Sequence, residues 1–267
     1  MSKIDQTPIE QSPEAVQLQP TDGRVELFPA WSAVDFILLT IAIVVCVFFV
    51  QGTGVILAML AGYKVDQITQ NTKLMVSVQV LSYLAVLGIM WRMVRYRSTN
   101  VLQAIRWNWP GQNAILYPAI GVALAVGIAF ATKLLDRFIP SNLPIEKMFR
   151  TQSDAWFLVF FGLTLAPLLE ELYFRGFLYP TLRRYAGGAI AITVTVLLFT
   201  AIHAPQIASS WVPLLMLTIA SLCFTVIRLK ADSVSAALLT HIGYNGTLFL
   251  TLFLATDGFR NLEKLAK

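Results

Sequence analysis

Charged residues are scarce in this sequence. Asp, Glu, Lys and Arg together make up 13% of the 267 residues, about half of the roughly 25% that is typical of a soluble domain. Two cysteines are too few for a disulfide-stapled fold, and 12 prolines and 15 glycines are too few for a collagen-like or low-complexity chain. Apolar residues make up 57% of the sequence. This composition indicates an integral membrane protein.

The first 30 residues differ in kind from the rest of the chain. They hold five acids and two bases, are rich in Gln and Pro, and contain a single aromatic residue, which is typical of disordered segments. They lack the basic start and short apolar run of a cleavable signal. We therefore expect a disordered acidic N-terminal tail over residues 1–30, a transmembrane helical domain over 31–255, and a C-terminal tail over 256–267.

Apolar runs long enough to cross a membrane recur along the chain. A spanning helix needs about 20 mostly apolar residues, and the charge-free run 185–227 is long enough for two spans, divided near its middle by His203-Ala-Pro-Gln. Seven spans are predicted: residues 33–59, 73–95, 111–133, 155–180, 188–204, 211–228 and 233–255. The predicted fold is an all-α, polytopic membrane bundle of about seven (six to eight) transmembrane helices.

The Lys and Arg residues of the short loops predict the orientation of this multi-pass protein. Three loops on one side of the bundle carry bases: Arg95, Arg97, Arg106, Arg183, Arg184, Arg228 and Lys230. The positive-inside rule places these loops, and with them the N-terminus, in the cytoplasm. Residues 134–152 on the opposite side also carry bases, and this loop can instead lie along the membrane surface.

A few polar residues lie inside the predicted spans, where an ionisable side chain is costly and commonly functional. They are Glu170, Glu171, Arg175, His203, His241 and Asn245, and they include both histidines of the chain. Glu171 and Arg175 are four residues apart on one helical face, so we expect a structural ion pair. Glu170 is rotated from Glu171 by about 100°, so the two carboxylates are expected to have separate tasks.

One free carboxylate, two imidazoles and one amide from three spans can converge in the interior of the bundle. A carboxylate and a histidine can hold a water molecule and remove its proton. A second histidine and an amide can stabilise the charge that develops on an attacked carbonyl oxygen. This set of groups supports hydrolysis of an amide bond inside the membrane, without a nucleophilic Ser or Cys.

Three motifs in this region resemble those of the CAAX protease and bacteriocin-processing (CPBP, or ABI) family of intramembrane proteases. They are the double Glu with Arg at Glu170-Glu171-Leu-Tyr-Phe-Arg175, the Phe199 and His203 pair, and the His241 and Asn245 pair. The order, spacing and placement on separate spans match over residues 155–255. The resemblance implies that Glu170 and His203 activate the water, that His241 and Asn245 form the oxyanion site, and that no cofactor is needed.

The sequence leaves several alternatives open. Glu170, His203 and His241 are also the ligand types of many catalytic zinc sites, although the chain has no His-Glu-x-x-His motif. The main alternative function is a non-catalytic membrane scaffold or regulatory protein that keeps the protease fold, and a proton-coupled transporter is a third. The expected partners are a membrane-associated protein or peptide substrate, either a prenylated CAAX-type protein or a bacteriocin-like peptide, and the lipid bilayer. Nucleic acid is not expected, because the bases are scattered in loops.

Overall fold

The computed structural model describes residues 19–21, 24–26, 28–140 and 143–263. Among these residues, seven helical segments are long and apolar enough to cross a membrane. They are Ala33–Leu60, Thr72–Arg97, Gly111–Leu134, Gln152–Ala186, Gly188–Ile207, Trp211–Ala231 and Val234–Ala255. The prediction of an all-α, multi-pass membrane bundle is therefore confirmed, and the predicted ends of the spans differ from the observed ends by a few residues.

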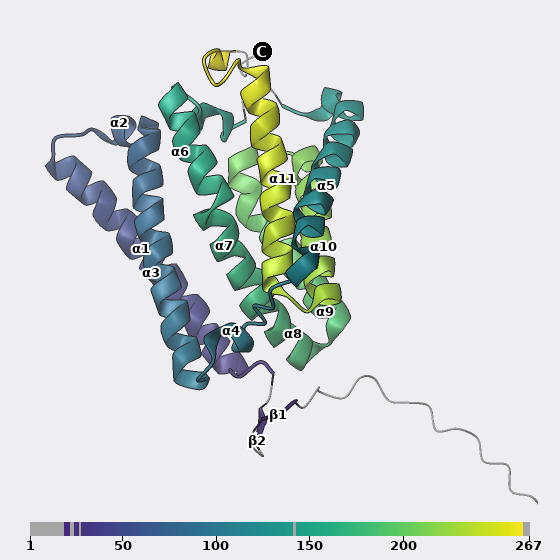
Figure 1. The fold of residues 1–267 in the computed structure, drawn as a ribbon. Helices are drawn as coiled ribbons and strands as arrows, with labels where there is room; N and C mark the ends of the chain where they lie inside the picture. The colour runs from purple at the N-terminus through teal and green to yellow at the C-terminus, as the bar shows by residue number, and fades with distance from the viewer. Residues whose placement is uncertain (1–18, 22–23, 27, 141–142, 264–267) are drawn as a thin grey trace, which may run out of the picture.

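The seven spans are built from the following elements, labelled as in Figure 1. The helices are α1 (Ala33–Leu60), α2 (Val65–Gln70), α3 (Thr72–Arg97), α4 (Val101–Ala104), α5 (Leu116–Leu134), α6 (Gln152–Leu163), α7 (Leu165–Glu171), α8 (Tyr179–Ala186), α9 (Gly188–His203), α10 (Trp211–Ala231) and α11 (Val234–Ala255). A π-helical segment, Leu172–Leu178, joins α7 to α8. Single 3-10 turns form at Gly111–Ile115, Asp136–Phe138, Glu146–Met148 and Ala204–Ile207.

Two short strands precede the first span. β1 (Gln19–Thr21) pairs antiparallel with β2 (Arg24–Glu26), with Pro20 opposite Val25. The sequence did not predict these strands. The predicted disorder of the N-terminal tail otherwise falls mainly on residues 1–18, which lie outside the described residues.

Helix α11 packs against α5, α10, α7 and α6, while α1 packs chiefly on α3. Figure 1 shows α1 leaning away from the other helices at the end that carries α2. The contact between α5 and α11 is close because both helices present glycine: a Cβ on Gly121 would lie 2.0 Å from the Thr240 carbonyl oxygen, and one on Gly243 would lie 2.2 Å from that of Pro118. Small residues of this kind allow membrane helices to approach closely.

The fourth span is not a continuous α-helix. It breaks at Thr164, whose φ of −120° and ψ of −85° separate α6 from α7. Pro167 explains the break, because its nitrogen cannot donate to the Leu163 carbonyl and its ring clashes with that group. The π-helical segment then follows directly after Glu171. Wide helical turns of this kind are frequent at functional sites.

Candidate active site

The structure brings together the free carboxylate and both histidines predicted from the sequence. Glu170 extends from α7 and lies between two imidazoles, one at the end of α9 and one in α11. Its Oε1 is 3.9 Å from His203 Nε2, and its Oε2 is 3.8 Å from His241 Nε2. These distances are too long for direct hydrogen bonds, and they suit a single bridging water.

Access to this group of side chains differs from one member to the next. Glu170 and His203 retain 14% and 16% of their side-chain surface, and His241 retains 5%. The carboxylate and the first imidazole can therefore be reached from outside the bundle, while the second imidazole is buried.

Residue Phe199 fixes the orientation of His203. The Nδ1 of His203 is 2.8 Å from the Phe199 carbonyl oxygen, and since a carbonyl only accepts, Nδ1 carries the hydrogen. Nε2 is then the acceptor nitrogen and faces Glu170. The rings of Phe199 and His203 also pack together, with their centroids 4.7 Å apart.

The ion pair predicted between Glu171 and Arg175 is present. Arg175 Nη1 lies 3.1 Å from Glu171 Oε1, and both side chains are fully buried. The same carboxylate oxygen lies 2.9 Å from His241 Nδ1. The expectation that the two glutamates have separate tasks is therefore incomplete, because the imidazole of His241 has one carboxylate near each of its nitrogens.

Asn245 lies one helical turn beyond His241 and contacts a different helix. Its amide Nδ2 donates to the Gly162 carbonyl oxygen in α6, 2.9 Å away. This bond uses one of the two amide hydrogens. The other hydrogen is available to a second acceptor, and the oxyanion role that the family resemblance implies for Asn245 stays a prediction.

Residues 152–247 match the family model described as type II CAAX prenyl endopeptidase Rce1-like. This part of the chain is similar to that family. The match confirms the resemblance that the three motifs indicate, and it supports the general class of a CAAX-type intramembrane protease. Comparison with curated proteins and with solved structures gave no match.

Several polar groups near the site were missed in the sequence. Tyr83 of α3, which lies outside the residues that match the family model, is close enough to Glu170 and Gln79 to interact with both. Gln79 Oε1 in turn accepts from Gln51 Nε2 of α1, at 2.7 Å. The sequence held a signal for these groups, because Gln51 and Gln79 are polar residues inside apolar runs, as the two histidines are.

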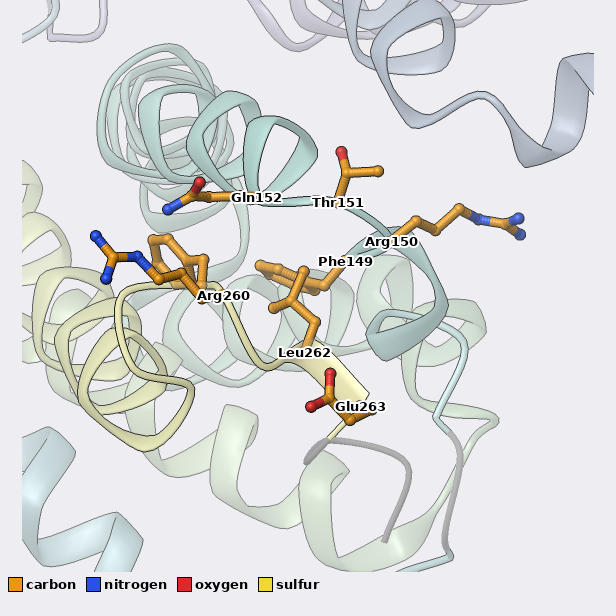
Figure 2. Close-up of a pocket in the computed structure, with 8 residues that line it drawn as sticks. Phe149, Arg150, Thr151, Gln152, Arg260, Leu262 and Glu263 are labelled. Carbon is orange, nitrogen blue, oxygen red and sulfur yellow. The ribbon is translucent and has the colours of Figure 1, made fainter.

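One hollow at the surface is lined by none of these groups. Figure 2 shows it beside the start of α6 and the C-terminal segment, where Arg150, Gln152, Arg260 and Glu263 line a volume of about 590 Å³. None of the six predicted site residues lines it. This hollow is therefore not the place where Glu170 meets a substrate.

The predicted alternative of a zinc site rests on Glu170, His203 and His241. Within the described ranges, no group of three or more His, Cys, Asp or Glu side chains has an arrangement that could hold a metal ion. Metal dependence itself stays a prediction in either direction.

Proposed function

We propose that this protein is an intramembrane endopeptidase that hydrolyses a peptide bond of a membrane-associated substrate with an activated water molecule. The observation that carries the proposal is the position of the Glu170 carboxylate between two Nε2 atoms, at 3.9 Å and 3.8 Å. The acceptor nitrogen of His203 faces the same carboxylate. A water between these two groups has two acceptors for its hydrogens, which is the arrangement that general-base catalysis requires.

The reaction proceeds by addition and elimination. Glu170 and His203 take a proton from the water as its oxygen bonds to the scissile carbonyl carbon. The carbonyl oxygen becomes an oxyanion, which the free hydrogen of the Asn245 amide stabilises, together with His241 when its Nε2 also carries a hydrogen. The carbon–nitrogen bond then breaks, and the proton held by the base passes to the leaving nitrogen. The products are a carboxylic acid and an amine, and no covalent enzyme intermediate forms.

The proposed mechanism uses no metal ion, and the proposed substrate is a prenylated protein with a C-terminal CAAX sequence. The substrate class follows from the name of the matched family, which describes prenyl endopeptidases. The exposure of Glu170 and His203 beside lipid-facing helices supports a substrate that is already held in the bilayer. We also propose that the N-terminus and the basic loops lie in the cytoplasm, where the positive-inside rule places them.

The test is cleavage of a quenched fluorescent, prenylated CAAX peptide by the purified protein in liposomes. Glu170→Gln and His203→Gln should each abolish cleavage while the helical content and the melting temperature stay near those of the unmodified protein. The double variant should be no worse than either single variant, because the two groups act on one water. Asp66→Asn, a change at an exposed carboxylate in α2, is the matched control and should cleave normally.

Three results would contradict the proposal. Normal cleavage by Glu170→Gln would show that the Glu170 carboxylate does not activate the water. Rate losses in the single variants that multiply in the double variant would exclude a shared water. Absence of cleavage by the unmodified protein, across prenylated and unprenylated membrane peptides, would favour the non-catalytic scaffold.

A further inference from the structure

Glu171 makes two contacts through one oxygen atom. Its Oε1 accepts from Arg175 Nη1 at 3.1 Å and lies 2.9 Å from His241 Nδ1. All three side chains are buried, with 0%, 0% and 5% of their surfaces exposed. Oε2 of the same carboxylate is buried and has no hydrogen-bond partner among the described residues. The bonds of Glu171 are therefore concentrated on the side that faces the active site.

The contact between Glu171 and His241 defines which imidazole nitrogen carries hydrogen. Arg175 keeps its charge in proteins and contributes only donors, so its partner oxygen is an acceptor. Because that oxygen is an acceptor, His241 Nδ1 must be the donor. His241 Nε2 is then directed to Glu170 Oε2. In this way, one hydrogen bond sets both the tautomer and the rotation of the ring.

Arg175 holds the Glu171 carboxylate in place. Its Nη2 donates to the carbonyl oxygen and to the hydroxyl of Ser221 in α10, at 2.9 Å and 2.8 Å, and its Nε donates to Thr225 Oγ1 at 3.3 Å. The guanidinium also lies over the Phe199 ring, 4.6 Å from its centroid. A rigid series of contacts thus runs from α10 through Arg175 and Glu171 to His241.

The His241 ring has no other hydrogen-bond partner of comparable geometry among the described residues. Phe224 stacks on its face, with centroids 4.5 Å apart and planes 20° apart, and Phe199 meets it edge-on at 6.0 Å. Stacking on a flat ring is equally possible after a 180° turn about the Cβ–Cγ bond, which exchanges nitrogen and carbon positions, and so it leaves the position of the nitrogens undefined. The hydrogen bond from His241 Nδ1 to Glu171 supplies this missing constraint.

We propose that Glu171 is a positioning residue, which holds His241 with Nδ1–H on its own carboxylate and Nε2 facing Glu170. Its task is therefore more than the structural ion pair expected from the i, i+4 spacing with Arg175. The catalytic consequence rests on the proposed hydrolytic function of His241, whereas the tautomer does not and can be measured without any substrate.

The first measurement is NMR of the imidazole nitrogens in protein labelled at histidine. The chain has two histidines, so the spectrum contains two sets of imidazole nitrogen signals. A His203→Gln variant shows which set belongs to His241. In unmodified protein, His241 should carry its hydrogen on Nδ1. Glu171→Met, which removes the acceptor, should move that hydrogen to Nε2 or mix the two tautomers. Glu171→Gln should keep the Nδ1–H form, because its carbonyl oxygen can take the place of Oε1 beside Arg175.

The second measurement separates positioning from folding. Arg175→Gln breaks the ion pair but leaves the Glu171 oxygen beside His241. Cleavage of the prenylated peptide should fall on the order of 10²-fold or more in kcat for Glu171→Met, as happens when a carboxylate that orients a catalytic histidine is lost, with KM little changed. Glu171→Gln should recover part of this loss. Arg175→Gln should lower the melting temperature more than it alters the His241 tautomer.

An unchanged His241 tautomer in folded Glu171→Met would overturn the proposal, as would equal effects of Glu171→Met and Arg175→Gln on that tautomer. A failure of the proposed function gives a different pattern. In that case unmodified protein does not cleave the peptide, while the NMR result for His241 still decides whether Glu171 positions the ring.

Discussion

Among the individual residues, Phe199 contacts two groups of the site that differ in charge. Its ring centroid lies 4.7 Å from that of His203 and 4.6 Å from the guanidinium carbon of Arg175. The same residue offers its carbonyl to His203 Nδ1. Phe199 thus orients the proposed base and also packs against the guanidinium of Arg175.

Contacts within one helix could be predicted from the sequence, and contacts between helices could not. The bonds from Arg175 to Glu171 and from His203 to Phe199 follow from the helical period, because each joins residues four apart. The bonds from His241 to Glu171 and from Asn245 to Gly162 join residues 70 and 83 apart. Those pairings depend on the rotation of packed helices about their axes, which nothing in the spacing of the motifs specifies.

We predict that cleavage activity survives a strong chelator. If Glu170 and His203 hold the water by hydrogen bonds alone, long incubation with EDTA or phenanthroline should leave kcat unchanged. A zinc ion among Glu170, His203 and His241 would instead lower the pKa of its bound water to about 7, and its removal would silence the enzyme. The measurement is the cleavage rate of the prenylated peptide before and after dialysis against chelator.

Loss of activity with recovery on addition of zinc would reassign both histidines as metal ligands. A metal assay of the purified protein provides the control, because a chelator that inhibits a metal-free protein acts by another route. The histidine NMR spectrum gives an independent check, since metal binding to Nε2 would alter both imidazoles together.

The helical elements could be predicted from hydropathy, but their interruptions were missed. Residues 155–180 were predicted as one span, whereas the structure divides this region into α6, α7, a π-helical segment and α8. The break at Thr164 had a visible cause in Pro167. The π-helical segment had none, because it is defined by a shift in hydrogen-bond partners that composition does not reveal.

The close contact of α5 with α11 leads to a prediction about Gly243, which lies between His241 and Asn245. Gly243→Ala would place a Cβ 2.2 Å from the Pro118 carbonyl oxygen, and a backbone atom cannot move aside cheaply. Overpacking of this kind typically costs about 1–3 kcal/mol. The variant should melt at a lower temperature and lose most of its activity, because α11 carries both site residues. Thermal melting in detergent and the cleavage rate are the measurements.

Gly127→Ala is the matched control for this prediction. Gly127 lies on α5, the helix that contacts α11, and a Cβ there would meet nothing within 4 Å. Alanine also favours a helix over glycine by about 0.8–1.0 kcal/mol, so this variant should be as stable as the unmodified protein or more so. Equal stability of the Gly243 and Gly127 variants would show that the helices are not in close contact in the membrane.

At the scale of the whole molecule, ion pairs and hydrogen bonds connect several helices at the end that carries the basic loops. Asp232 pairs with Arg228 at 2.9 Å and with Arg106 at 3.1 Å, and its carbonyl accepts from Asn108 at 2.7 Å. Arg228 also donates to the Arg175 carbonyl oxygen at 3.1 Å. Polar contacts therefore connect this end of the bundle with the buried ion pair of the site.

The last prediction concerns the orientation of the protein in the membrane. Single cysteines are placed at exposed positions on opposite ends, Thr99→Cys between α3 and α4 and Lys64→Cys between α1 and α2, after Cys46 and Cys223 are replaced by alanine. An impermeant maleimide applied to intact spheroplasts should label Lys64→Cys, and it should label Thr99→Cys only after lysis. The reason is that Arg95, Arg97 and Arg106 surround Thr99 in the sequence, and short loops rich in Lys and Arg remain in the cytoplasm. The reverse labelling pattern would show that the bases of residues 134–152 determine the topology, and would place both the N-terminus and the Arg106–Asp232 contact on the outer side.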